Sequence, residues 1–409
     1  MDNATHTLCG LALARAGLDR LDPRATATLV AASSLPDLDI VVQLFGGQPA
    51  YLCHHRGITH ALLGLCLETF LLAGLVWAWA RRRALDPART STARRWPPTP
   101  TPPSRFWPLA LVAGVGFASH LALDGLNTYG IRPFLPFSGQ WYYGDVAFIV
   151  DPWLWLTLGA GAALGAPAPT ASAPAPAGAP GALAPPRPIW GWVLFAVLVL
   201  EGMIVQQRID AGPIPFLWGA GMAALVALRR QGVGLRRRRT TALLGIGAAA
   251  LYLLLLGSCS RAAAGRALLA GQERFGAPVE RLSCQPHPGR VHAFQAVVSS
   301  RERSAVFQVD LLRGTISLES ERRRGLDDPT LLRALARAAD RPEVEAWRVF
   351  ARHPFLDRAG GLLIMGDARY APEARAGWCN LAVPFEGQPD PQGRHEPGPD
   401  AQAPAPGAQ

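Results

Sequence analysis

Long apolar runs, separated by arginine-rich or proline-rich segments, make up most of the chain before residue 258. Residues 61–80 form a run of 20 residues in which Glu68 is the single charged side chain. As a helix, a run of this length extends about 30 Å, which matches the hydrocarbon core of a bilayer. Similar runs occupy residues 106–123, 148–166, 189–205, 214–228 and 240–257. The pattern predicts a mainly α-helical, multi-pass membrane protein.

Arginine-rich loops set the predicted orientation of these runs. Residues 81–105 and 229–239 are both rich in arginine, and the positive-inside rule places such loops in the cytoplasm. Counting through the spans then puts residues 54–60, 124–147 and all residues after 257 on the extracytoplasmic side of an inner membrane. An apolar segment at 25–35 leaves the side of the N-terminus open.

The C-terminal part has a different pattern. Residues 291–300, 304–312, 361–370 and 378–386 read as strands, and residues 328–340 read as a helix with an acidic first turn. This predicts a small α+β domain in which Cys284 and Cys379 could pair after export. The predicted divisions are a membrane-embedded site region (1–155), the end of the third span with a Pro/Ala-rich linker (156–188), three further spans (189–257), the α+β domain (258–386) and a disordered tail (387–409).

Composition supports a membrane protein and argues against a nucleic-acid partner. The chain is 49% hydrophobic and 17% charged, which is too apolar for an ordinary soluble protein of 409 residues. Its net charge is +10 without a single lysine. The arginines lie beside apolar runs, as membrane topology requires, and no nucleic-acid-binding module is recognisable. Membrane lipids are therefore the expected partners.

Histidine and aspartate side chains gather in four short stretches of the first half. His120 and Asp124 are four residues apart, so they share one face of a helix at membrane depth, where ionisable groups are expensive and usually functional. Gly57 allows a turn that directs His55 and His60 to one point. The full set of predicted metal ligands is His6, Asp37, Asp39, His55, His60, His120 and Asp124.

Imidazole and carboxylate ligands together suit zinc, with manganese as the alternative. Seven candidates exceed the three protein ligands of a usual catalytic zinc. The sequence does not decide between two arrangements: two ions that share a carboxylate, or one ion whose ligands are held by further partners.

Three of these stretches carry a family resemblance. "LPDLD", "HRGITHALL" and "HLALDGLNTYGIRPFLPF" resemble the LexA-regulated, membrane-bound metal-dependent hydrolases, or YdjM-like family, over residues 1–155. The family's usual LPDxDH motif ends here in Ile40, which removes one ligand. The family is distantly similar to zinc-dependent phospholipases C and single-strand nucleases. The resemblance implies a phospholipase C-like helical metal site and a hydrolytic activity.

A hydrolytic mechanism assigns roles to the remaining polar residues. A metal ion lowers the pKa of its water to about 7. One of Asp37 and Asp39 would be a ligand, while the other orients a histidine or accepts the proton of the water. Asp124 is the expected bridging carboxylate and Arg56 the expected phosphate contact. The predicted catalytic residues are Asp39, Arg56, Asn127 and Asp145, with Thr128 and Asp151 as supporting residues.

The expected substrate is a phosphoester or a lipid headgroup at the outer membrane face. Two other classes stay open. One is an ion-path or transport protein, although the runs at 189–205 and 240–257 contain almost no polar residue except Glu201. The other is a structural membrane protein that a metal stabilises without catalysis.

Overall fold

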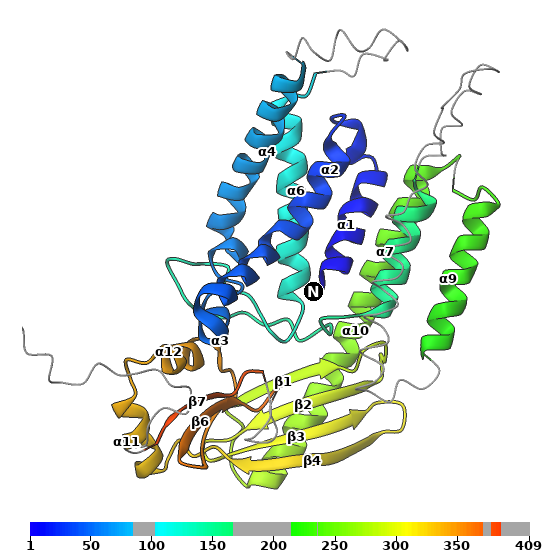
Figure 1. Cartoon of the computed structure of the whole chain (residues 1–409). Helices are drawn as coiled ribbons and strands as arrows, with labels where there is room; N and C mark the ends of the chain where they lie inside the picture. The colour runs from blue at the N-terminus through cyan, green and yellow to red at the C-terminus, as the bar shows by residue number, and fades with distance from the viewer. Residues whose placement is uncertain (85–102, 167–213, 235, 371–377, 386–409) are drawn as a thin grey trace, which may run out of the picture.

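The computed structural model describes residues 1–84, 103–166, 214–234, 236–370 and 378–385. Roughly aligned helices form one layer, and two small sheets lie together at one end of it (Figure 1). The α-helices of this layer are α1 (Asn3–Arg15), α2 (Ala25–Ser34), α3 (Gln43–His54), α4 (Leu62–Ala84), α6 (Phe106–Gly125), α7 (Pro152–Leu164), α9 (Ile214–Arg230) and α10 (Arg238–Phe275). Short 3-10 helices are η1 (Leu18–Arg20), η2 (Leu35–Val42) and η3 (Ile58–His60).

Among the residues that the structure describes, four segments are long and apolar enough to cross a membrane: Ala25–His60, α4, α6 and α10. The multi-pass prediction is confirmed at 61–80, 106–123 and 240–257. The runs at 148–166 and 214–228 form shorter helices, α7 with 13 residues and α9 with 17. The predicted span at 189–205, the linker at 167–188 and the tail at 387–409 lie outside the described residues.

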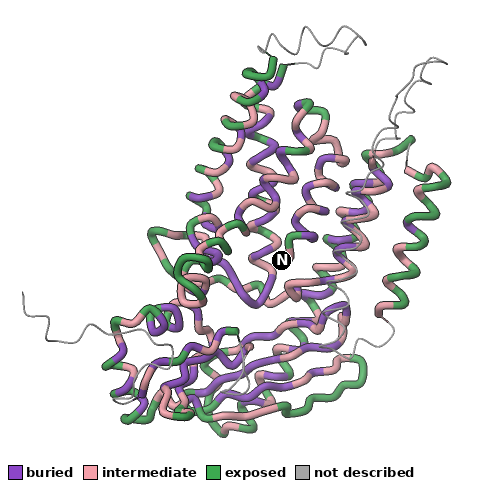
Figure 2. The backbone as a smooth tube through the Cα atoms, in the orientation of Figure 1, coloured by how far each residue is buried: buried purple, intermediate pink, exposed green. Residues whose placement is uncertain are grey.

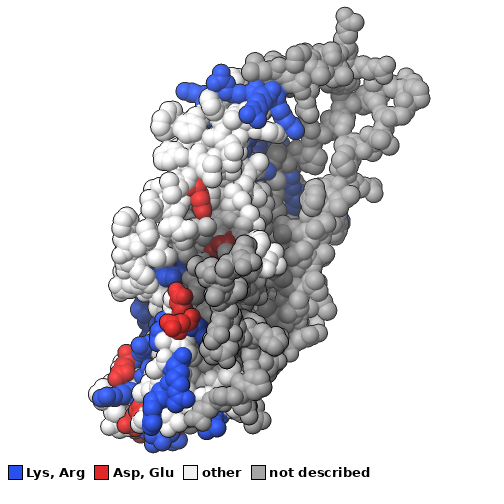
Figure 3. All heavy atoms as spheres, turned by 60° about the vertical axis from the view of Figure 1, so that its left-hand side comes forward, with Lys and Arg blue, Asp and Glu red and all other residues white. Residues whose placement is uncertain are grey.

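Arginines gather at the end of the helical layer that is far from the sheets. The last turn of α4 contains Arg81, Arg82 and Arg83, and α10 starts with Arg238 at the same end (Figure 1). On the face that includes α4, a broad and largely uncharged belt separates these arginines from the charged C-terminal part (Figure 3). This distribution is the one expected for a protein embedded in a bilayer.

Helices α1 and α2 form a short hairpin that begins and ends at the same level. They contain 13 and 10 residues, which corresponds to lengths of about 20 Å and 15 Å. Small residues allow α2 to pack closely on α1 and α6, since a Cβ atom on Gly116 would lie 2.6 Å from the Cβ of Ala32. His6, near the start of α1, is therefore at the same level as the residues that follow α2.

The C-terminal part is a small α+β domain, as predicted. A four-stranded antiparallel sheet runs in the order β1-β2-β3-β4, and a three-stranded sheet runs in the order β5-β6-β7. The strands are β1 (Arg281–Pro286), β2 (Ala293–Ser299), β3 (Arg303–Asp310), β4 (Thr315–Arg323), β5 (Pro354–Ala359), β6 (Leu362–Asp367) and β7 (Leu381–Pro384), with helices α11 (Pro329–Arg337) and α12 (Pro342–Phe350). The sequence patterns did not predict β1, β4, β5 or α12.

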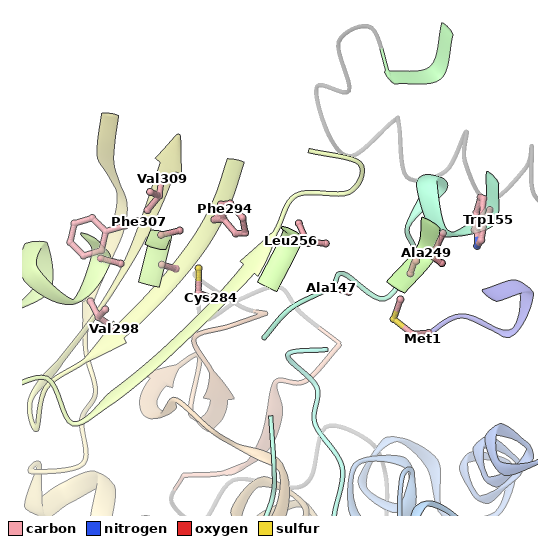
Figure 4. Packing of buried hydrophobic residues seen from close by; sticks show 14 of the residues in the cluster. Met1, Ala147, Trp155, Ala249, Leu256, Cys284, Phe294, Val298, Phe307 and Val309 are labelled. Carbon is pink, nitrogen blue, oxygen red and sulfur yellow. The ribbon is translucent and has the colours of Figure 1, made fainter. Parts of the chain in front are cut away.

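One hydrophobic core joins this domain to the helical layer. The 38-residue helix α10 continues through the boundary predicted at residue 257 and packs its second half on β1, β2 and β3. Phe294 and Phe307 of the sheet share a cluster with Leu256 of α10 and Trp155 of α7 (Figure 4). Buried positions run along the inner sides of the helices and through the strands (Figure 2).

Cys284 and Cys379, whose pairing the sequence left open, do not form a disulfide. Both cysteines are buried, and each is a free thiol. Cys284 belongs to the core between α10 and the four-stranded sheet, whereas Cys379 belongs to a separate core around α12 and the three-stranded sheet. Two cores that are built on different elements keep these side chains apart.

His353 is a buried histidine that makes the stability of this domain depend on pH. Its side chain is fully buried, and Nδ1 is 2.7 Å from the hydroxyl of Ser299. Burial lowers the pKa of His353 well below its usual range. The unfolded chain takes up a proton below about pH 6.5, which the folded protein does not. Stability is therefore complete above that value and falls as the pH drops below it.

We expect the thermal midpoint of the detergent-solubilised protein to fall between pH 7.5 and pH 5.5. The loss attributable to His353 is at most about 1.4 kcal/mol per pH unit. His353→Gln should reduce this slope. His292→Gln, on the turn before β2, should leave the slope in place because His353 is still present. Equal slopes for wild type and His353→Gln would contradict the assignment.

Candidate metal centre

Four side chains from three segments bring their ligand atoms together at the end of the helical layer that faces the C-terminal domain. Asp37, His60, His120 and Asp124 each offer one atom, and all four atoms lie within 4.8 Å of one another. His60, His120 and Asp124 are essentially inaccessible to solvent, and the side chain of Asp37 is 11% exposed. The predicted cluster of histidine and aspartate is thus assembled by η2, η3 and α6.

The spacing of these atoms fits a tetrahedral ion. The two Nε2 atoms of His60 and His120 are 3.0 Å apart. Asp37 Oδ1 is 3.5 Å and 3.6 Å from them, and Asp124 Oδ2 is 3.2 Å and 3.6 Å from them. A tetrahedral zinc with bonds of about 2.0–2.1 Å requires ligand atoms about 3.3–3.4 Å apart. The residues present therefore fit a divalent metal in both chemistry and size.

Hydrogen bonds orient both histidines so that Nε2 faces the centre. Nδ1 of His120 lies 2.8 Å from the carbonyl oxygen of Ser33, to which it can only donate. Nδ1 of His60 lies 3.0 Å from the hydroxyl oxygen of Thr59, which itself donates to Asp39, and 3.3 Å from a carboxylate oxygen of Asp39. With the proton on Nδ1, each Nε2 carries a lone pair. Carbonyl and carboxylate partners of this kind commonly hold metal-binding histidines in place.

Asp39 holds the loop instead of contributing a ligand. Its two carboxylate oxygens contact Nδ1 of His55 at 2.7 Å, the backbone N–H of Arg56 at 2.9 Å and the hydroxyl of Thr59 at 2.9 Å. Of the two alternatives that the sequence left open, Asp37 reaches the centre and Asp39 orients the histidines around it. Asp39 therefore lies outside the group of four that the structure brings together.

His55 and His6 also lie outside the group of four. His55 uses Nδ1 to contact Asp39, and its ring stacks on Tyr51. His6 stacks on the ring of His120, with centroids 3.8 Å apart. Its Nε2 lies 3.2 Å from Asp124 Oδ1 and 3.9 Å from Asp37 Oδ2, the oxygens that do not face the other two histidines. The same Asp124 oxygen also contacts the amino group of Met1, so His6 supports Asp124 and the ring of His120 from outside the group of four.

Arg56 is a buried structural cation at the edge of the centre. Its Nε is 3.0 Å from Asp124 Oδ2, and its Nη1 donates to Asn127 Oδ1 at 2.9 Å and to the carbonyl of Gly130 at 3.1 Å. Its guanidinium also lies over the ring of Tyr129. Arg56 has a φ of +55°, a conformation that side chains rarely adopt. The predicted phosphate contact is thus already paired, and Asn127 serves to hold it.

Asp145 and Asp151 are not part of the centre, so the sequence expectation for both is corrected. Asp145 forms a bidentate ion pair with Arg352 of the C-terminal domain, with distances of 2.7 Å and 2.8 Å. Asp151 caps the N-terminus of α7 and accepts a hydrogen bond from the hydroxyl of Tyr252. One residue fastens the C-terminal domain to the membrane region, and the other starts a helix.

A chamber of about 730 Å³ separates the centre from the C-terminal domain. Of the four clustered residues, Asp37 lines this chamber, together with His55 and Arg56. The opposite wall belongs to the C-terminal domain and includes Gln285, Gln295, Arg369, Tyr370 and Trp378. Sequence reasoning missed these wall residues because no local motif marks them, and tertiary packing alone brings them to the site.

Several direct contacts hold the C-terminal domain over the chamber. Arg369 is buried, pairs with Asp367, and donates from Nη1 to the carbonyl of Thr128 at 2.6 Å. The indole N–H of Trp141 donates to the carbonyl of Val349 at 2.7 Å. The domain therefore forms a roof on the metal centre, fixed by hydrogen bonds and by the bidentate ion pair of Asp145.

The fold and the cluster define a multi-pass membrane protein with a buried histidine–aspartate centre beneath an α+β roof. A family model described as YdjM inner membrane protein matches residues 1–209, which is just over half of the chain. The chain therefore belongs to the YdjM inner membrane protein family. No curated protein and no solved structure matches it, so the likeness to phospholipases C stays a prediction.

Proposed function

We propose that this protein is a metal-dependent hydrolase of phosphoesters. The observation that carries the proposal is the meeting of four electron-pair donors, two imidazole nitrogens and two carboxylate oxygens, in one buried group. Two imidazole Nε2 atoms lie 3.0 Å apart beside two carboxylate oxygens. Lone pairs at this distance repel one another, and buried carboxylates are costly without a cation. A divalent ion, zinc in the first place and manganese as the alternative, would neutralise the group.

The charge around the centre supports a cation of high charge. Asp37, Asp39 and Asp124 supply three carboxylates, and among the described residues Arg56 is the guanidinium that contacts them. With neutral histidines, these side chains carry an excess of negative charge. The amino group of Met1 also contacts Asp124. A divalent metal held here would supply Lewis acidity, which acidifies water and polarises a phosphoryl oxygen.

His55 is the residue of this chain that is best placed to move a proton. Its Nδ1 is held by Asp39 at 2.7 Å, and its ring lines the chamber. The carboxylate fixes the ring and leaves Nε2 to exchange a proton with a group in the chamber. Asp37 lies at the chamber edge of the centre, so a substrate reaches the centre past Asp37. Arg56 keeps Asp124 in place through its own contact.

Two guanidinium groups favour an anionic substrate. Arg56 and Arg369 both line the chamber, one on the membrane side and one on the roof. Both guanidinium groups already have protein partners, so they would favour an anion through their charge at the chamber wall and not as its main hydrogen-bond donors. The site lies at the end of the helices opposite the arginine clusters of α4 and α10 (Figure 1). By the positive-inside rule, we place the centre and its roof on the extracytoplasmic side.

A hydrolysis assay on the purified, metal-loaded protein tests this function. The substrates are bis-p-nitrophenyl phosphate, a soluble phosphodiester, and p-nitrophenyl acetate, an acyl ester. We expect turnover of the phosphodiester, its loss after chelation, and its return when zinc or manganese is added. Turnover of the acyl ester alone would overturn the substrate class. Metal-loaded protein that cleaves neither would contradict hydrolysis and favour a structural role of the metal.

A further inference from the structure

We propose that the substrate is a membrane lipid that stays anchored in the bilayer, with its polar headgroup in the chamber and its acyl chains along residues 38–45. This inference rests on the proposed function and specifies its substrate. The headgroup that the chamber selects carries hydroxyl or phosphate oxygens, and the roof of the C-terminal domain forms half of the binding surface.

Residues 38–45 expose a continuous set of large apolar side chains beside the metal centre. Leu44 and Phe45 are 81% and 87% exposed, and Leu38, Ile40 and Val41 are between 44% and 58% exposed. Asp37 turns toward the centre from this same segment, and Ile40 lines the chamber. Such a surface would be unfavourable in water. It leads directly from the chamber wall to the outside of the helical layer.

This apolar surface faces the bilayer together with α4. The outer side of α4 exposes Leu67 at 61% and Leu71 at 63%. The chain passes from α3 through η3 into α4, so the two surfaces neighbour each other at the level of the centre (Figure 1). The face that includes α4 is largely uncharged between its two ends (Figure 3). Acyl chains that cover α4 can therefore continue onto residues 38–45.

The size of the chamber suits a headgroup better than a whole lipid. Its volume is about 730 Å³, within the usual range of small-molecule sites. Two sixteen-carbon chains alone occupy roughly 1,000 Å³, if each carbon group takes about the 30 Å³ of a water molecule. The chamber thus has room for a headgroup with its phosphate, and the proposal leaves the acyl chains outside it.

Two residues of the chamber wall carry buried polar atoms that lack a partner. Asn127 Nδ2 and Thr128 Oγ1 make no hydrogen bond with any residue that the structure describes, and both residues line the chamber. Unsatisfied buried polar groups are costly. Both groups can donate a hydrogen bond, so a ligand that reached them with phosphate or hydroxyl oxygens would remove this cost.

Two aromatic rings that line the chamber are already covered by cations. The guanidinium of Arg56 covers the ring of Tyr129 at 4.7 Å, and that of Arg369 lies 4.8 Å from the ring centre of Tyr370. A second cation on these two faces would be repelled by the first. A choline group is therefore disfavoured on Tyr129 and Tyr370, and the headgroup in this proposal is an anionic one such as glycerol phosphate.

A photo-crosslinking experiment tests the location of the headgroup without relying on catalysis. The metal-loaded full-length protein is placed in vesicles that contain phosphatidylglycerol with a diazirine on its headgroup. Tryptic peptides are then analysed by mass spectrometry. We expect labels on residues 282–290 and 291–301, which include the roof residues Gln285 and Gln295. Unlabelled phosphatidylglycerol should reduce the labelling at least about fivefold more than phosphatidylcholine does.

Matched variants separate the bound lipid from lipids that merely surround the helices. Leu44→Ser/Phe45→Ser removes apolar surface beside the chamber, and Leu67→Ser/Phe70→Ser removes a comparable surface from α4. We expect the first pair to lower roof labelling and vesicle-lipid hydrolysis about tenfold, with soluble phosphodiester hydrolysis within twofold of wild type. The α4 pair should resemble wild type in all three.

The outcomes distinguish this inference from the proposed function. Soluble turnover without roof labelling, or roof labelling that both variant pairs reduce equally, would overturn the lipid inference and leave the hydrolase intact. Roof labelling that falls only in Leu44→Ser/Phe45→Ser, in a protein that hydrolyses nothing, would support the lipid site and contradict the hydrolase. Preferential competition by phosphatidylcholine would overturn the choice of headgroup.

Discussion

Replacing His60 or His120 with alanine should remove the metal from this protein, whereas His54→Ala should not affect it. His60 and His120 present Nε2 atoms 3.0 Å apart at the centre, and each supplies one of four ligand atoms. Loss of a ligand should weaken metal binding by more than about 100-fold, since losing even an outer hydrogen-bond partner costs 10–100-fold. His54 is an exposed residue in the last turn of α3, so its removal tests for a general effect of losing imidazole.

Competitive titration with a zinc indicator would measure these affinities in detergent-purified protein. Circular dichroism of each variant should show retained helix content, because three ligands and the surrounding packing remain. Unchanged affinity in both His60→Ala and His120→Ala would rule out the centre. Equal loss in His54→Ala would show that the variants act through the fold and not through ligation.

His55→Gln should give the second largest effect of the predicted variants. Unlike His60→Ala and His120→Ala, it should lower turnover without removing the metal. We expect the variant to keep its metal and to lose about 10²–10⁴ in phosphodiester turnover, the usual contribution of a positioned acid or base. The reason is that His55 contacts Asp39 through Nδ1 and lines the chamber without reaching the four ligand atoms. Glutamine can keep the hydrogen bond to Asp39 but cannot transfer a proton at the position of Nε2.

The pH profile of turnover separates proton transfer from a structural role. In wild type, turnover should change with pH over part of the profile, and this change should be absent in His55→Gln. The variant His54→Gln should keep both the pH dependence and the rate of wild type. Metal content should be equal in all three proteins. If His55→Gln released its metal, the original sequence prediction of His55 as a ligand would be right and the proton-transfer role wrong.

The chemical character of the centre could be predicted from sequence because its parts follow local rules. His120 and Asp124 share a helix face by their spacing, and Gly57 permits the turn that precedes His60. The choice between Asp37 and Asp39 could not be made in the same way. Both follow Pro36 in η2. Only the packing of α2, η3 and α6 directs Asp37 toward the centre and places Asp39 where it binds the loop before α4.

Long-range pairing explains the errors. Asp145 lies close in sequence to the site residues, yet its partner Arg352 is 207 positions away, and no local pattern reveals that distance. Likewise, the three-dimensional structure brings four of the seven predicted ligands into one group, and the sequence alone does not indicate which four. The helices α4, α6 and α10 were predictable from apolar length. The hairpin of α1 and α2 was not, because the two helices contain 13 and 10 residues and the apolar segment at 25–35 could be read either as part of a span or as a short helix.

The roof is the feature that sequence reasoning could least anticipate. Its strands were partly predictable from alternation, but its role depends on Arg369 reaching Thr128 and on α10 extending from the helical layer under the sheet. These contacts turn an open cluster at a membrane surface into a lined chamber. The C-terminal domain, which carries no catalytic motif, thereby belongs to the same functional unit as the centre.

X-ray absorption spectroscopy at the edge of the co-purified metal tests the central claim most directly. The account predicts a zinc or manganese edge and a shell of nitrogen and oxygen neighbours only; for zinc, these lie at about 2.0–2.1 Å with two imidazole rings. A sulfur neighbour at about 2.3 Å would place the metal on cysteine instead. The absence of any metal edge, or a spectrum unchanged in His120→Ala, would contradict a centre built from Asp37, His60, His120 and Asp124.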